Sequence, residues 1–243
     1  MIGPANPSVF ITDETRPSSI SQALRKISCS EVDRNLCRKL DVRPIRTTFE
    51  LESVYRITHD SYLERHYCEP QPNGRLVHFP EYDCIPETTV LIAVLDGEIV
   101  GTTSFTLDGP LGLHVDHDFK STCDLIRSEN RTLAASWRLA TKSTFRNQNE
   151  VVMALISATT RILLDSGTQT CLFTFNPRHE RIYQRLLNMK TVARGDRARG
   201  LLNAPSVLMR CDHEEVPERF RAGLQPGSIF RAPILSLQFH GRA

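Results

Sequence analysis

The sequence predicts a single α/β (α+β) domain organised around one mixed β-sheet. The clearest β signal is a hairpin, in which the apolar runs 88–95 and 98–107 flank Asp96-Gly97, a dipeptide that favours a two-residue turn. Strand-like and helix-like segments then alternate over 133–189. A hairpin followed by such steps makes a sheet that is antiparallel at first and parallel in the middle.

The N-terminal part divides into an arm and the start of the domain. Residues 1–41 hold several Pro and Ser residues and then a weak helical spacing, so we expect a loose arm with one short amphipathic helix. The folded domain is expected over 42–212. Residues 42–48 alternate like a strand and 50–64 have helical spacing, whereas 66–86 hold four prolines and one glycine and are predicted to be a long loop.

The second half of the domain continues the same pattern. The best helical stripe spans 150–165 and is expected to end at Gly167. Residues 213–243 have little pattern and are interpreted as a C-terminal extension. After the hairpin, in order, we expect a helix at 119–127, strands at 133–141 and 168–175 on either side of the 150–165 helix, a helix from Pro177, and strands at 190–194 and 204–211.

The composition excludes several classes of protein. A net charge of +2 and a pI near 8.2 are too mild to indicate a nucleic-acid partner. The seven cysteines are odd in number and show no Cys-x-x-Cys spacing, which favours a reduced, cytoplasmic chain. No apolar run approaches ~18 residues, and the first residues do not form a secretory signal, so we expect no membrane span.

The most informative motif is NPRHERIYQRLLNM at 176–189. Asn176 closes a β-like run, a proline suited to a first helical turn follows, and Tyr183 lies two turns further on. This arrangement resembles the signature of the GNAT acyltransferase superfamily. The resemblance implies two central strands that splay apart, with the Asn at the end of one and the Tyr facing a thioester sulfur. Tyr183 and Asn176 are therefore the candidate catalytic residues, although Tyr183 could equally be a buried helix anchor.

Further motifs resemble those of the N-acyl amino acid synthases of the FeeM type and their relatives, the acyl-homoserine-lactone synthases. They are VYRITHDSYLE at 54–64, HFPEYD at 78–83, SWRLA at 136–140 and NAPSVLMRCD at 203–212. The resemblance implies an N-acyltransferase that moves a long-chain acyl group from acyl carrier protein to the amine of an amino acid or similar acceptor. It makes Arg138 and Asp83 candidates for acceptor binding.

The turn after the 133–141 strand bears on the donor. Acetyl-coenzyme A users of the superfamily generally have glycines there that cradle a pyrophosphate, but TKSTFRNQNE at 141–150 has none. Lys142, Arg146, Arg178 and His179 could instead meet the single phosphodiester of a carrier-protein arm, or they could be plain surface charge and helix capping. No cofactor is expected beyond this acyl-phosphopantetheine donor. Six arginines over 178–199 could form a basic surface that binds an acidic carrier protein, or they could simply be a solvated face. They are Arg178, Arg181, Arg185, Arg194, Arg197 and Arg199.

Three charged positions of the lactone synthases are replaced here. Where the lactone synthases have a glutamate in this strand, the present chain has Ala135. An arginine of their preceding strand aligns with Ser104, and an arginine of their first helix aligns with Thr58. Those groups hold S-adenosylmethionine in the lactone synthases, so that substrate is not expected. Two alternatives stay open: a catalytically inactive acyl- or carrier-protein-binding relative, and an acyltransferase of the type associated with exosortase systems, which shares the long loop and the EYD turn.

A metal site is the remaining candidate. Residues 114–118, HVDHD, offer ligand types at tight spacing. A closed zinc site needs four well-spread ligands, and the resemblance makes this segment a framework turn, so we expect no metal.

Overall fold

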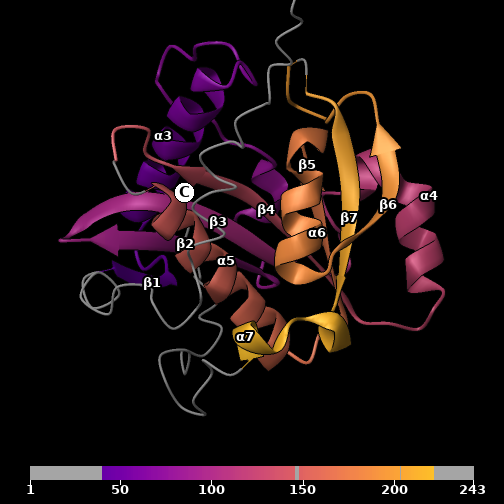
Figure 1. Cartoon of the computed structure of the whole chain (residues 1–243). Coiled ribbons are helices and arrows are strands. Elements are labelled where there is room, and N and C mark those ends of the chain that lie inside the picture. Colours follow the sequence, from indigo (N-terminus) through magenta and orange to yellow (C-terminus); the bar gives the residue numbers. More distant parts are fainter. Residues whose placement is uncertain (1–39, 146–147, 203, 222–243) are drawn as a thin grey trace, which may run out of the picture.

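The computed structural model describes residues 40–145, 148–202 and 204–221. Their strands form one mixed seven-stranded sheet in the order β1-β2-β3-β4-β5-β7-β6 (Figure 1). Only β4 and β5 pair in parallel. This is the mixed sheet that the sequence predicts. The strands are β1 Leu40–Pro44, β2 Thr88–Leu95, β3 Glu98–Leu107, β4 Leu133–Thr141, β5 Thr170–Phe175, β6 Lys190–Gly195 and β7 Ser206–Asp212.

Helices cover both faces of the sheet. The longer ones are α3 Thr48–Glu64, α4 Asp116–Arg127, α5 Gln148–Asp165 and α6 Glu180–Leu187, and short turns lie at η1 Pro80–Tyr82, η2 Pro177–His179, η3 His213–Glu215 and α7 Glu218–Arg221. Because alternate strand residues point to opposite faces, Val90 and Ile92 pack on α3 while Leu91 and Ala93 pack on α5. Figure 1 shows α5 and α6 on the same side of the sheet.

The predicted hairpin is confirmed. Strands β2 and β3 end on either side of Asp96 and Gly97, which both have positive φ, 50° and 87°. Two consecutive positive φ values are what a two-residue turn matched to the strand twist requires. A second glycine, Gly101, serves close packing: a Cβ there would come 2.7 Å from Val151 of α5. The absence of a side chain therefore brings α5 directly onto β3.

The splay between the central strands is also confirmed. Pairing of β4 with β5 runs from Leu133↔Thr170 to Ser136↔Phe173 and then stops, although β4 continues to Thr141 and β5 to Phe175. Backbone groups beyond that point are released from the parallel ladder on the side where the strands diverge. The gap opens at the carboxyl ends of both strands.

Strand β4 also bulges at the splay. Thr102 faces Ala140 but Ser104 faces Trp137, so two β4 residues stand opposite one β3 residue. Arg138 lies at this insertion with φ 56°. A residue in the left-handed region within an antiparallel pair is the hallmark of a β-bulge, which bends the strand and re-aims its side chains. As a result the side chains of Trp137 and Arg138, although neighbours in one strand, both lie on the α3 side of the sheet.

Several boundaries differ from the sequence predictions. The first strand begins at Leu40 rather than 42, the helix after Pro177 opens with the 3₁₀ turn η2, and α4 begins three residues early at Asp116. The 213–243 extension begins with the short turns η3 and α7; Val216, which lies between them, and Phe220 of α7 are buried in the core. The short helix expected within 1–41 lies outside the described residues. No helix of the described part is long and apolar enough to cross a membrane.

Candidate active site

A cavity of about 300 Å³ occupies the splay between β4 and β5. Its walls come from both faces of the sheet, since Tyr62 of α3 and Met153 of α5 both line it. The remaining walls are the diverging strand ends, α6, and the segment between β6 and β7. The cavity therefore passes through the sheet at the one place where the strands separate.

One stripe of α5 forms the longest wall. Val152, Met153, Ile156, Thr159 and Thr160 line the cavity, at the spacings that put side chains on one helix face. From Gln148, which also lines it, to Thr160 the helix advances about 18 Å at ~1.5 Å per residue. The cavity is thus long, and its lining along α5 is apolar at Val152, Met153 and Ile156 and carries hydroxyls again at Thr159 and Thr160.

The two residues predicted to be catalytic, Asn176 and Tyr183, both line this cavity. Asn176 caps the turn that follows β5, because its side chain accepts a hydrogen bond of 3.2 Å from the Arg178 amide. Tyr183 is 9% exposed and stacks on Phe175, with ring centroids 3.8 Å apart and planes 8° from parallel. Burial holds the pKa of its phenol well above the ordinary value.

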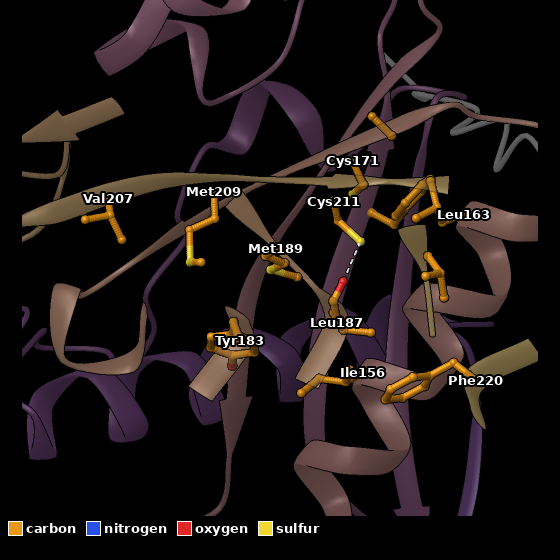
Figure 2. Close-up of a cluster of buried hydrophobic side chains, with 13 residues drawn as sticks. Ile156, Leu163, Cys171, Tyr183, Leu187, Met189, Val207, Met209, Cys211 and Phe220 are labelled. Carbon is orange, nitrogen blue, oxygen red and sulfur yellow. Dashed lines mark hydrogen bonds between the residues drawn. The ribbon is translucent and has the colours of Figure 1, made fainter. Parts of the chain in front are cut away.

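Tyr183 also belongs to the core. Figure 2 shows it in the same buried cluster as Ile156, Leu187 and Phe220. Within the described part of the chain its hydroxyl has no hydrogen-bond partner. The side chain therefore combines an anchored ring with a free polar group at the cavity wall, and both roles that the sequence leaves open are compatible with this position.

The structure brings Arg138 and Asp83 together from 55 positions apart. Their side chains form an ion pair that is almost fully buried, with 0% and 2% of each exposed. The Arg138 guanidinium donates to both carboxylate oxygens and to Ser104 Oγ, at 2.8 Å for the shorter contact with the serine. The Tyr55 hydroxyl donates to Asp83 at 2.9 Å, and the Trp137 ring lies 4.3 Å from the guanidinium carbon.

This network has a mechanical role. A non-glycine residue with positive φ is strained, and it persists where surrounding contacts over-determine its conformation. Arg138 is held by a carboxylate, a hydroxyl and an aromatic face at once. The pair therefore fixes the bulge of β4, and with it the wall of the cavity that Arg138 lines.

Aromatic rings pack behind Trp137 on the α3 side. His114 and Phe79 lie 5.5 and 5.7 Å from the Trp137 ring, and His78 lies 6.4 Å from it. Burial lowers the pKa of His78 to about 4 and that of His114 to about 3. Both imidazoles are therefore neutral near pH 7 and serve as packed rings. Sequence reasoning did not single out His78 because its partners are distant in the chain.

The predicted donor-binding residues are not all in one place. Lys142 lies outside the cavity lining and forms an ion pair with Glu98, and Arg146 lies outside the described residues. His179 lines the cavity. Arg178 lies beside it, donating from Nε to His179 Nε2 at 3.1 Å and from Nη2 to the Tyr67 hydroxyl at 3.0 Å. Through His179 and Tyr67, η2 and the loop after α3 therefore contribute to the wall of the cavity.

The segment 114–118 has a structural role. Asp116 accepts from Arg127 and from the Leu113 amide, and burial keeps His114 inside the aromatic cluster. Among the described residues no group of His, Cys, Asp or Glu is arranged to hold a metal ion.

Some lining residues carried no sequence signal. Thr103 and Ser136 bring hydroxyls within 3.4 Å of each other beside the bulge, and Thr159 and Thr160 place hydroxyls on the α5 wall. Ser and Thr are common in cores and turns, so their type does not indicate a site. Only the strand pairing and the helix stripe identify them.

Comparisons with known proteins agree with this geometry. The family model of the N-acyl amino acid synthase FeeM matches residues 53–212. The structure of FeeM from uncultured soil microbes superposes with a TM-score of 0.64 at 20% identity, over 75% of this chain and 93% of that chain. No curated protein matches the chain.

Two acyl-homoserine-lactone synthases share the fold. LasI superposes with a TM-score of 0.58 at 14% identity, over 76% of this chain and 96% of that chain. BjaI, described as coenzyme A-dependent and solved with S-adenosylmethionine and isopentyl-CoA, superposes with a TM-score of 0.53 at 17% identity, over 76% of this chain and 86% of that chain.

These neighbours establish the fold, and the family match establishes the relationship. The matched range 53–212 spans well over half of the chain and contains Asp83, Arg138, Asn176 and Tyr183. The chain belongs to the FeeM family of N-acyl amino acid synthases and is an acyltransferase.

Proposed function

We propose that this protein transfers a long-chain acyl group from acyl carrier protein to the amine of an amino acid or similar acceptor. The observation that carries the proposal is the shape of the cavity, which follows α5 for about 18 Å beside the splay. An acetyl group needs no such length. Side chains such as Val152, Met153 and Ile156 offer a long alkyl chain an apolar wall.

The reaction needs few side chains. The amine nitrogen attacks the thioester carbonyl carbon and the carbonyl oxygen becomes an oxyanion; the C–S bond then breaks as the carbonyl forms again, and the proton lost by the nitrogen balances the proton gained by the thiolate. Backbone N–H groups released from the ladder at the splay are suited to the oxyanion, since such preorganised donors are usually the largest catalytic contribution. The free hydroxyl of Tyr183 is the candidate proton donor to the thiolate. Asn176 caps the turn that holds Tyr183's helix at the strand end.

Two observations support a carrier-protein donor. The turn after β4 has no glycines for a pyrophosphate cradle, and Lys142, its first cation, is paired with Glu98. On the outer surface of α6, Arg181 and Arg185 are exposed and form no ion pair within the described part of the chain, so they are available to an acidic partner. BjaI is described as coenzyme A-dependent, so the fold alone does not decide the donor.

The acceptor side is proposed to lie under the 66–86 loop. Arg138 and Asp83, the candidates for acceptor binding, neutralise each other there. We therefore propose that the ion pair shapes the cavity wall at Arg138. Any contact with an acceptor would be made by the two residues together. Tyr62 of α3 and Arg65, the residue after that helix, line the cavity and are candidates to meet the acceptor's polar groups.

The charges that remain at the site are paired with each other. The lactone synthases have an acid at the position of Ala135 and an arginine at the position of Ser104. These positions share the α3 face on neighbouring strands, because Thr106 pairs with Ala135 and Ser104 pairs with Trp137. With the helix arginine that falls at Thr58, one negative and two positive charges have been lost, whereas the remaining Arg138–Asp83 pair is balanced and fully bonded. This favours an active enzyme over an inactive acyl-binding relative.

Steady-state assays with long-chain acyl carrier protein and with acetyl-coenzyme A test the donor. We expect the carrier-protein donor to give the higher kcat/KM, and efficient turnover of acetyl-coenzyme A would contradict the proposal. Lipid extracts of an overexpressing bacterium, analysed by mass spectrometry beside a vector control, identify the acceptor. New N-acyl amino acids are expected, whereas their absence would favour the exosortase-associated type or the inactive relative.

A further inference from the structure

His179 occupies a defined place at the cavity. It lines the wall as the residue preceding α6, and Tyr183 follows one helical turn later on the same face. Arg178, its neighbour, is exposed and donates to the hydroxyl of Tyr67, which also lines the cavity. The turn therefore places an imidazole in the cavity wall and an exposed guanidinium beside it.

The hydrogen bond from Arg178 fixes the tautomer of His179. A guanidinium is always a donor and never an acceptor, so the 3.1 Å contact from Arg178 Nε requires a lone pair on His179 Nε2. A neutral imidazole without hydrogen on Nε2 carries it on Nδ1. In the described part of the chain no side chain or backbone group accepts from this Nδ1–H.

The surroundings also keep the ring uncharged. Burial and the nearby cations Arg178 and Arg65 lower the pKa of His179 to about 4. Arg65 directly follows α3 and Tyr67 lies in the loop after it, while Tyr183 belongs to α6. None of these groups is an anion that could stabilise an imidazolium. The ring therefore offers one neutral N–H donor to whatever fills the cavity.

We propose that His179 binds the acyl donor through a hydrogen bond from Nδ1–H to an amide carbonyl of its pantetheine arm, and not through the phosphate. This inference rests on the proposed function, with the thioester sulfur at Tyr183. A neutral donor suits an amide oxygen, whereas a phosphate is better served by a guanidinium such as the exposed Arg178.

The spacing along the arm agrees. His179 and Tyr183 are separated by about 6 Å along the helix at ~1.5 Å per residue. In pantetheine the first amide carbonyl lies roughly four bonds from the sulfur, about 5 Å when extended, given bond lengths of ~1.5 Å. The phosphorus lies roughly 13 bonds away, about 16 Å. A sulfur at Tyr183 thus brings the amide, and not the phosphate, to His179.

The test compares substitutions that move the donor atom. His179→Asn places its amide NH₂ near the position of Nδ1, His179→Gln places it near Nε2, and His179→Leu removes it. Each variant is assayed with acyl-pantetheine and with acyl-phosphopantetheine, which differ only in the phosphate. His66→Asn is the matched control, because His66 is exposed, has no side-chain partner in the described part, and has a positive φ that Asn tolerates.

We expect His179→Gln and His179→Leu to lose about tenfold in kcat/KM on both donors, the effect of one neutral hydrogen bond, with His179→Asn within about threefold of wild type. A loss confined to the phosphorylated donor would assign His179 to the phosphate and overturn the inference, as would equal activity in all variants. If the wild type uses neither small donor, the variants are compared with long-chain acyl carrier protein, where equal activity in all variants overturns the inference and no turnover by the wild type counts against the proposed function. Imidazole ¹⁵N NMR of the wild type is expected to show the Nδ1–H tautomer at pH 7, and hydrogen on Nε2 would also refute it.

Discussion

Replacing Asp83 by asparagine is expected to destabilise the protein by about 3–5 kcal/mol, the typical cost of removing one partner of a buried ion pair. The side chains of Arg138 and Asp83 are 0% and 2% exposed, so water cannot replace the lost charge. Asparagine keeps the shape but exchanges one acceptor oxygen for an NH₂ that faces a guanidinium or the Tyr55 hydroxyl. Ser104 and Trp137 retain their contacts with Arg138 and keep the loss within this range.

Urea unfolding with linear extrapolation measures this change, and the thermal midpoint should fall by roughly 6–20 °C for a chain of this size. The matched control is Asp165→Asn, which removes the partner of Arg161 from an exposed helical pair and should cost less than about 1 kcal/mol. Replacing both partners, Arg138→Met with Asp83→Leu, should cost less than Asp83→Asn alone. An Asp83→Asn variant within about 1 kcal/mol of the wild type would refute the reasoning.

Three further predictions concern the cavity and its surroundings. Tyr183→Phe keeps the stack on Phe175, so kcat should drop at least about tenfold with an unchanged thermal midpoint; an unchanged kcat would remove the hydroxyl from the mechanism. His78 and His114 have pKa values of about 4 and 3 in the folded protein, below the ordinary 6.5. As the pH falls, the two histidines are therefore protonated in the unfolded chain before they are protonated in the folded one. Stability should be complete above about pH 6.5 and fall as the pH is lowered toward 3, and a flat urea midpoint from pH 7 to 4.5 would contradict this. Ile156→Phe narrows the α5 wall and should shift the preferred acyl chain to shorter lengths in an acyl-donor series, whereas an unchanged profile would exclude Ile156 from the acyl site.

The sheet could be predicted where local signals agree with tertiary structure. Strands β2, β3 and β4 begin and end at the predicted residues, because alternating burial and an Asp-Gly turn act within a few positions. The short turn α7 was not predicted. Four residues carry no periodic signal, and Phe220 is ordered by packing against a core assembled from distant segments.

The candidate site was only partly predictable. The resemblance singled out Arg138 and Asp83 separately, but their mutual pairing depends on a bulge that a strand pattern does not reveal. Likewise, the sequence marks Arg178 and His179 as two basic neighbours. Their mutual hydrogen bond and the neutral state of the imidazole depend on side-chain geometry and burial, which only the folded chain supplies.

The short parallel seam has a consequence for motion. The half-sheet β1-β2-β3-β4 and the half-sheet β5-β7-β6 are joined only from Leu133↔Thr170 to Ser136↔Phe173. Such a short paired segment can act as a hinge between the two half-sheets, and the width of the gap between β4 and β5 would change as they rotate. An alkyl chain in the cavity would contact α5 on one half-sheet and α6 on the other, and would restrict their relative motion. Amide hydrogen exchange along β4 and β5 should therefore slow when the acyl donor binds.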